Sequence, residues 1–481
     1  MKIQLRPESD GYKNWIESPV TTTRAYRLFN VTNYKTIMTN PSSPMEIQET
    51  DPFMYKLSIK KNDIDWSDDN SEVSYSVERL FERIDTFNEA LLNEKGAFVD
   101  IPRLLFRTKF DPKAHENMFI GAGYNVFDNH TRAVDLIEGF ASRIFAFIQA
   151  QMVGPNTDKY GYIYRVSMYN GSRGYNFTIR TGSDNLMEKG RVVDYKSEYS
   201  PFRTNYSKYN FSFYDGLTFP PLNNPTKMPA INIFQADFCR PIQLRYNQTL
   251  PMFGLNAVHE YVLRLVDHET CSDMNVTCEE SQYLDISKCF SETLKDAFYL
   301  SKPHMYTTNT SLPTNWNVNF IPDKDRHEST VYFEPITGTP IKAQLRVQLN
   351  ARTYVDKIEV DIHENTKVID AEGVKRIIPM FWIDQTITLN DATLSKFIHI
   401  NQLMHTGRRF YETFKVGYII VSFLLCLALI AFLEMMHYFR QNQSSMEETI
   451  TLSQKTMKSS PEQQRLVRTM PTEVIHNIVV A

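Results

Sequence analysis

The most distinct hydrophobic pattern in the chain is a run of 18 residues without a charge, near the C-terminus. It covers Val416 to Leu433 and has the sequence VGYIIVSFLLCLALIAFL. As a helix this run would rise about 27 Å, close to the ~30 Å hydrocarbon core of a bilayer. A core helix of that length nearly always carries some outward-facing polar residues. We therefore expect a transmembrane helix over residues 416–436.

Alternation of apolar and polar residues dominates the region before that helix. The most regular alternation lies in Ile341–Asn350, which predicts an antiparallel strand with one solvent-facing side. Tyr354–Ile362 alternates in the same way, and Asn350–Arg352 would join the two strands as a hairpin. Further strand-like runs are Met45–Ile59, Tyr175–Thr181 and Glu260–Val266. These patterns predict an outer region that is mainly β.

One helical pattern stands out, at Thr131–Val153, where apolar residues recur at helical spacing until Gly154–Pro155. Upstream of it, Asp100–His115 carries basic residues interleaved with leucine and phenylalanine. This segment is either an ordinary amphipathic surface or a cationic apex for anionic lipid or lipoprotein. The basic residues are Arg103, Arg107, Lys109 and Lys113.

Composition and motifs limit the classes of function. Of the 481 residues 42 % are hydrophobic and 22 % are charged, which indicates a globular protein rather than a disordered one. The net charge of −4 is not the basic excess that marks a nucleic-acid binder. The chain has no HExxH, GxSxG or P-loop motif, and Gly121–Gly123 lacks the third glycine of a dinucleotide loop. We expect no enzyme activity, no cofactor and no metal site.

Glycosylation sequons indicate how the chain is oriented in the membrane. N-x-S/T occurs nine times before Val416 and once after it, at Asn442. By chance it occurs about once per couple of hundred residues, so nine sites are a strong excess. We expect residues 1–415 to be extracellular or lumenal and the tail to be cytosolic, with Asn442 unmodified. The nine candidate glycosylation sites are Asn30, Asn129, Asn170, Asn176, Asn205, Asn210, Asn247, Asn275 and Asn309.

Cysteine usage agrees with an oxidising compartment. One of the five cysteines, Cys426, lies in the membrane segment. An even number in the outer region predicts two disulfides, and four cysteines allow three pairings. A zinc site would need two close C-x-x-C-like pairs, which these spacings do not provide. The four outer cysteines are Cys239, Cys271, Cys278 and Cys289.

Nine segments form an ordered set that spans nearly the whole chain. They are Leu5–Ser18, Tyr26–Asn33, Tyr160–Tyr164, Gly174–Gly182, Gly216–Pro221, Asp237–Pro241, Leu284–Cys289, Tyr332–Gly338 and Pro379–Ile383. In residues and in order, this set resembles the class B scavenger receptor family, which includes fatty-acid and lipoprotein receptors and a lysosomal integral membrane protein.

The resemblance implies a fold that is mainly β with some α. It implies a large antiparallel β-barrel-like ectodomain over residues 1–415, a helical cap at about 91–153 and an internal hydrophobic tunnel. By position it pairs Cys239 with Cys289, and Cys271 with Cys278. The family has a membrane helix at each end, so the first helix is expected to be absent from this sequence. The polar tail, residues 437–481, is expected to be disordered.

The resemblance also implies a receptor that binds and transfers lipids through the tunnel. The ligands would be fatty acids, sterols, phospholipids or lipoproteins, with the basic residues of 100–115 as the cationic contact. One alternative is a lysosomal membrane receptor that binds a hydrolase through the cap, and another is an adhesion receptor. We expect the plasma membrane rather than the lysosomal membrane. In the tail, Glu462–Val467 is close to an acidic dileucine sorting signal, and Val479–Ala481 matches a PDZ ligand.

Overall fold

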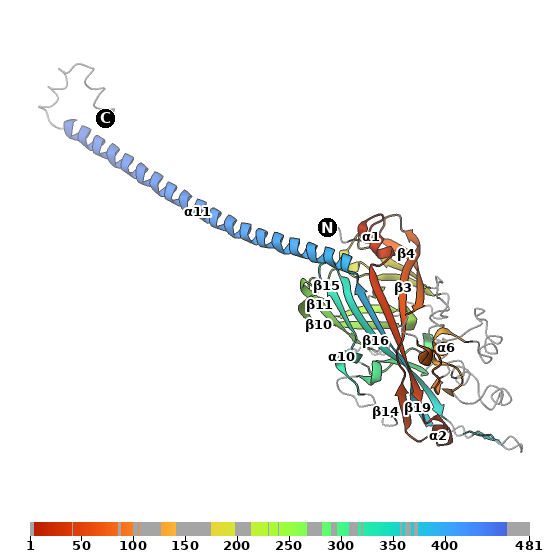
Figure 1. Ribbon diagram of the computed structural model, residues 1–481. Coiled ribbons are helices and arrows are strands. Elements are labelled where there is room, and N and C mark those ends of the chain that lie inside the picture. The colour runs from red at the N-terminus through yellow and green to blue at the C-terminus, as the bar shows by residue number, and fades with distance from the viewer. Residues whose placement is uncertain are drawn as a thin grey trace. The chain divides into compact units, whose positions relative to one another are not determined.

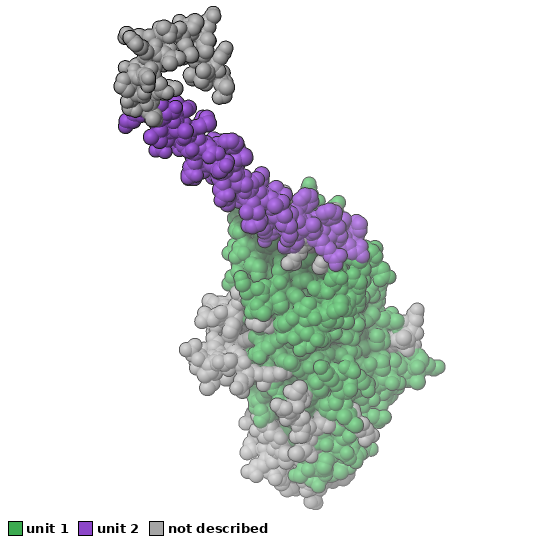
Figure 2. Space-filling model, turned by 90° about the vertical axis from the view of Figure 1, so that its left-hand side faces the viewer, with its two compact units in different colours: residues 1–398 green, residues 399–481 purple. Residues whose placement is uncertain are grey.

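The computed structural model divides the chain into two compact units, residues 1–398 and residues 399–481 (Figure 2). Each unit is considered by itself below. The residues that the structure describes are 4–40, 42–84, 88–99, 104, 127–140, 175–197, 213–228, 230–238, 240–266, 281–289, 296–306, 316–318, 321–355, 358–360, 367–369 and 374–458.

A 15-stranded, almost entirely antiparallel sheet forms the framework of the first unit (Figure 1). Its main path is, in order, β8 (Val192–Ser197), β7 (Tyr175–Arg180), β4 (Glu72–Arg83), β3 (Phe53–Trp66), β1 (Val20–Val31), β19 (Val374–Leu389), β16 (Thr339–Val355), β15 (Thr330–Glu334), β11 (Leu255–Arg264), β10 (Arg240–Met252) and β9 (Ala230–Gln235). Four strands branch from this path: β2 (Met45–Glu49), β14 (Trp316–Val318), β12 (Leu284–Asp285) and β13 (Phe298–Ser301). The pairing of β14 with β2 is parallel. The prediction of a mainly antiparallel β region is confirmed.

Short elements decorate the sheet. Two further strand pairs are β5 (Phe98–Val99) with β6 (Phe127–Asp128), and β17 (Ile358–Val360) with β18 (Lys367–Ile369). The α-helices of the first unit are short: α1 (Asp10–Ile16), α2 (Tyr34–Thr39), α3 (Glu89–Leu92), α6 (Ala133–Glu138) and α10 (Lys324–His327). The 3₁₀ turns are η2 (Leu186–Glu188), η4 (Ala236–Phe238), η5 (Ser287–Cys289) and η6 (Pro303–Met305).

No closed barrel is found among the described strands, because the path begins at β8 and ends at β9. The segment 213–215 makes hydrogen bonds to both of these strands. The carbonyl of Phe213 accepts from the amide of Val192 at 2.8 Å, and the carbonyl of Tyr214 accepts from the amide of Phe234 at 2.9 Å. The sheet therefore wraps around an interior, into which alternate residues of each strand point.

The strand at Ile341–Asn350 is confirmed, but the predicted hairpin after it is wrong. Strand β16 runs straight through Asn350–Arg352 to Val355 and pairs with β19 along that length. The predicted wet face is also partly wrong, because Arg346, Gln348 and Asn350 are buried. Their hydrogen bonds explain the burial: Gln348 donates to Asn350 at 2.7 Å, and Asn350 donates to Ser301 at 3.0 Å.

Two other predicted elements differ from the structure. The helix expected over Thr131–Val153 is interrupted, because α6 ends at Glu138 and Gly139 has φ +112°, a conformation that favours glycine. The rest of that range, 141–153, lies outside the described residues. The run Met45–Ile59 is two strands, β2 and β3, because Thr50–Pro52 lies between them and proline has no amide hydrogen for a ladder.

The long helix α11 begins at Asp391, in the first unit, and ends at Lys458, so that residues 399–458 of this helix are the described part of the second unit. Within it, Arg409–Lys455 is long and apolar enough, by length and composition, to cross a membrane. This candidate span contains the predicted membrane segment, Val416–Leu433. The expected disorder of the tail is wrong for residues 437–458, which continue the helix. Residues 459–481 lie outside the described residues.

Candidate functional site

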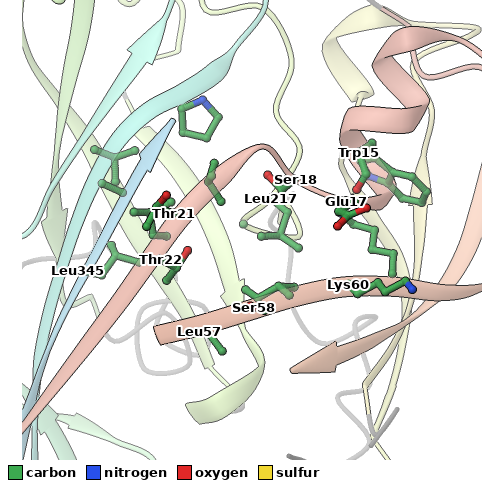
Figure 3. A pocket seen from close by; sticks show the side chains of 18 of the residues that line it. Trp15, Glu17, Ser18, Thr21, Thr22, Leu57, Ser58, Lys60, Leu217 and Leu345 are labelled. Atoms are coloured by element: carbon green, nitrogen blue, oxygen red, sulfur yellow. Dashed lines mark hydrogen bonds between the residues drawn. The ribbon is translucent and has the colours of Figure 1, made fainter. Parts of the chain in front are cut away.

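A cavity of about 470 Å³ lies inside the first unit, between β1 and β3 on one side and strands β9, β10, β15, β16 and β19 on the other (Figure 3). It lies at the end of the sheet from which the chain enters α11. Ile387 of β19 lines it, Leu389 pairs with Val20 of β1, and the amide of Asn390 donates to the carbonyl of Pro19 at 2.9 Å. The volume falls within the ~300–1,000 Å³ range of ligand pockets.

The far walls of the cavity are mainly apolar. They come from different strands, because each strand directs every second residue inward. The apolar residues from the far strands include Ile233, Ile242, Val331, Ala343, Leu345 and Ile387, and Leu57 and Ile59 of β3 also line the cavity. An aliphatic chain in this space would be removed from water at a gain of about 0.8 kcal/mol per CH₂.

One buried lysine, Lys61, also lines this space. Its side chain continues the inward face of β3, and the residue is only 4 % exposed. Its Nζ donates a hydrogen bond to the carbonyl of Trp15 at 2.6 Å and lies 4.7 Å from the centre of the Trp15 ring. Burial lowers the pKa of Lys61 to about 8, although Asp215 opposes the shift. The ammonium group is therefore mostly charged at neutral pH.

The carboxylate of Asp215 is occupied by other partners. Its Oδ1 accepts from the amides of Leu217 and Thr218, at 2.9 and 2.6 Å. Its Oδ2 accepts from the hydroxyls of Tyr75 and Thr218, at 2.7 and 3.1 Å. Within the described part of the chain, no carboxylate oxygen lies within 4 Å of the Nζ of Lys61. Lys61 is thus a buried positive charge in a residue that lines the cavity, and its Nζ also lies 5.6 Å from the centre of the Tyr75 ring. An anionic head group would be the complementary ligand for such a charge.

A buried polar layer lies next to the cavity, farther along the strands from the start of α11. In β1, Arg24 follows the cavity residue Thr22 by two positions, and in β19, Gln385 precedes the cavity residue Ile387 by two. Side chains two residues apart in a strand share a face. Arg24 and Gln385 therefore face the same interior as the cavity, one layer farther on.

Ion pairs hold this polar layer together. The Arg24 guanidinium donates to Gln385 Oε1 through Nε, at 2.7 Å, and lies 3.6 Å from Asp237 through Nη2. Arg79 of β4 also pairs with the Asp237 carboxylate. The side chains of Arg24 and Asp237 are 5 % and 4 % exposed. Buried charges in such a layer are tolerated because they are paired.

The structure describes only some of the site residues predicted from sequence. Arg103, Arg107, Lys109 and Lys113 lie outside the described residues, as do Cys239, Cys271 and Cys278. Cys289 is buried in η5, and its Sγ lies 3.9 Å from the carbonyl oxygen of Asp237, two residues before Cys239. The pairing inferred from the resemblance stays a prediction.

Four of the predicted glycosylation sites are described. Asn247 of β10 is exposed, whereas Asn30, Asn129 and Asn176 are half-buried. The Oδ1 atom of Asn30 accepts a hydrogen bond from the amide of Ala97 at 2.8 Å. A glycan would be attached to the other side-chain atom, Nδ2, which takes no part in this bond. Glycosylation at these positions stays a prediction. Asn170, Asn205, Asn210, Asn275 and Asn309 lie outside the described residues.

Sequence analysis did not identify Lys61 or Arg24. A signal was present for Lys61. In β3 the inward positions are Phe53, Tyr55, Leu57 and Ile59, and the next inward position is a lysine. A charged residue in phase with an apolar face indicates a buried charge. The alternation could have shown that Lys61 is buried, but not which charges it faces.

A large antiparallel β unit with a mainly apolar cavity, followed in the chain by a helix long and apolar enough to span a membrane, fits the class of membrane proteins that carry one large β-rich unit. The sequence profile of the CD36 family matches residues 1–433. The chain belongs to the CD36 family, the family of class B scavenger receptors.

Several curated relatives are similar along the chain. Sensory neuron membrane protein 1 of Ostrinia nubilalis is 24 % identical over 425 residues, which cover 81 % of this chain and 76 % of that protein. The same-named protein of Helicoverpa assulta is 28 % identical over 231 residues, and the match spans 40 % of its length. Human lysosome membrane protein 2 is 23 % identical over 409 residues, covering 82 % of this chain and 80 % of that protein.

Proposed function

We propose that the ectodomain binds a lipid amphiphile in the cavity and transfers it to or from a membrane. The observation that carries this proposal is the combination of an apolar cavity of about 470 Å³ with the buried ammonium group of Lys61. An acyl chain would contact the apolar walls. An anionic head group would lie at Lys61, where its charge replaces the water that the lysine loses on burial.

The charge balance around Lys61 favours an anionic ligand. Burial lowers the pKa of both Lys61 and Lys189 to about 8, and both lysines interact electrostatically with the one carboxylate of Asp215. Lys189 in addition donates to the carbonyl of Thr337 at 3.1 Å and interacts with Glu334. A ligand carboxylate beside Lys61 would raise the pKa of this lysine again, because it stabilises the charged form.

Replacing Lys61 by methionine tests this proposal. Methionine keeps the unbranched apolar stem but removes the charge, so binding of a fatty-acid probe should weaken about tenfold, the loss of one buried charge-assisted contact. The affinity of cis-parinaric acid for the purified protein, measured by fluorescence, provides the readout. Methyl parinarate, which has no carboxylate, should bind Lys61→Met and the unmodified protein alike.

The matched control is Lys196→Met, at an exposed lysine of β8 that does not line the cavity. It should leave the affinity for both probes unchanged. Equal affinity of cis-parinaric acid for Lys61→Met and Lys196→Met would contradict the role of Lys61. No saturable binding of either probe to the unmodified protein would contradict the proposed function itself.

A further inference from the structure

The cavity is lined by residues from both faces of one strand. Lys56, Ser58 and Lys60 of β3 are exposed, whereas Leu57 and Lys61 of the same strand are buried, and all five line the cavity. Because successive side chains of a strand point to opposite faces of its sheet, an enclosed cavity would be lined by only one of the two sets. The cavity therefore opens through the sheet, along the edge of β3.

The pairing register locates this opening between β1 and β3. The two strands pair from Tyr26 with Phe53 to Thr23 with Lys56, and they meet again only at the isolated bridge of Glu17 with Lys60. Five residues of one chain segment, 18–22, thus lie opposite three of the other, 57–59. With two residues in excess the segments cannot pair in register, and Pro19 has no amide hydrogen to donate. Figure 3 shows the strands diverging at Thr22 and Ser58.

The dimensions of this gap suit a narrow ligand. Three residues of a strand extend about 10 Å, and so the opening admits a single chain more readily than a broad ring system or a second polypeptide layer. On the far side of the gap each strand keeps its other neighbour, since β1 pairs with β19 and β3 pairs with β4. The gap is therefore held open by a continuous sheet on both sides.

The route along the interior is less direct than the route through this gap. The polar layer of Arg24, Arg79, Asp237 and Gln385 lies across the interior next to the cavity. An acyl chain that moved along the interior would have to pass this polar layer. It would separate the paired charges and put them in contact with its methylene groups, which costs free energy. A chain that moved sideways between Thr22 and Leu57 would leave these ion pairs in place.

The rim of the gap combines an exposed apolar side chain with charged side chains. Leu80 of β4 lines the cavity and is 41 % exposed, and so it offers an apolar contact at the surface. Lys56 and Lys60 lie exposed on the same side of β3, one on either side of Ser58. Glu17 and Glu78 line the cavity as well, so a head group that passes from the exposed lysines to the buried Lys61 meets charges of both signs.

We infer that the gap between β1 and β3, bounded by residues 18–22 and 57–59, is a lateral port through which a single-chain anionic amphiphile enters and leaves the cavity. This inference rests on the proposed lipid-binding function. It adds that the ligand enters and leaves sideways through the sheet. The port and the head-group site can be altered independently, because Ser58 lies at the opening and Lys61 lies inside.

A reversible block of the port tests the inference. In a Cys426→Ser background, which removes the exposed thiol of α11, Ser58→Cys is labelled with a bulky methanethiosulfonate reagent, and Lys196→Cys is labelled as the control. The rates of uptake and release of cis-parinaric acid are then measured by stopped flow, before labelling, after labelling, and after dithiothreitol removes the label.

Labelling at position 58 should slow uptake and release together by at least about tenfold, with little change in the equilibrium affinity, because a port changes rates and not the bound state. Dithiothreitol should restore both rates, and the label at position 196 should change neither. Unchanged rates in fully labelled Ser58→Cys, with normal affinity, would overturn the lateral port alone. If the unlabelled protein binds no probe, the proposed function fails and the port fails with it.

Discussion

Replacing Asp237 by alanine is expected to lower the free energy of unfolding of the first unit by about 3–5 kcal/mol. The carboxylate of Asp237 lies between two buried guanidinium groups, those of Arg24 and Arg79. Without it, two positive charges would remain close together in an interior where water does not solvate them. Burial makes this ion pair costly to break, even where forming it contributes little net stability.

Urea unfolding of Asp237→Ala and of the unmodified protein at neutral pH measures this effect. The matched control is Asp194→Ala, which removes an exposed carboxylate 3.8 Å from Lys196 on the outer surface of β8. Surface pairs of this kind contribute about 0–1 kcal/mol. A loss below about 1 kcal/mol for Asp237→Ala, comparable with the control, would show that the polar layer is not the ionic cluster described above.

Acidification is expected to destabilise the first unit through a buried histidine pair. The rings of His304 in η6 and His327 in α10 are 4.2 Å apart between centres, and each lies 5.8 Å from the ring of Trp382. Nδ1 of His327 accepts a hydrogen bond from the amide of Asp323 at 2.8 Å. A protonated ring could not accept this bond, and the turn of α10 would lose it.

Burial decides the direction of the effect, and the charged groups around the pair modify its size. His304 Nε2 lies 2.5 Å from Glu49 Oε2 of β2, and Arg27 of β1 lies 3.4 Å from the same carboxylate. Burial, followed by the charges of His304 and Arg326, lowers the pKa of His327 to about 4, while Glu49 and Asp323 oppose the shift. The folded state thus favours the neutral ring more strongly than the unfolded chain does.

The sign follows from linkage. A histidine with a pKa of about 6.5 when unfolded and about 4 when folded contributes stability that is present above pH 6.5 and lost as pH falls toward 4. Between pH 7 and pH 5 the expected loss is about 2 kcal/mol. In His327→Asn, whose amide oxygen can accept from Asp323 but does not titrate, this part of the acid sensitivity should disappear. An identical pH dependence of urea unfolding in this variant would contradict the assignment.

The sequence predicted the β-rich region and the long apolar helix that follows it because both follow from local patterns. Period-two alternation in Ile341–Asn350 and an uncharged run at Val416–Leu433 are properties of single segments. Errors arose where contacts with segments distant in the sequence determine whether a residue is buried. Gln348 and Asn350 belong to a polar pattern, but Ser301 and its neighbours cover them. The periodicity of the apolar residues predicted a helix that continues past Gly139. The positive φ of this glycine instead ends the helix at Glu138.

The candidate site could be predicted only in part, for the same reason. The alternation in β3 is enough to place Lys61 on the inward face, with Leu57 and Ile59. Its ligand potential depends on Asp215, which lies 154 positions later in the chain and is engaged by other donors. The opening between β1 and β3 depends on a mismatch of two residues between strands, which no single segment shows.

The most direct test of the account is lipid extraction from the purified, natively folded full-length chain, followed by mass spectrometry. The account predicts an acyl lipid with an anionic head group at close to one molecule per protein, reduced in Lys61→Met and retained in Lys196→Met. A well-folded protein that carries no lipid, and that takes up none from vesicles containing fatty acid, would contradict it.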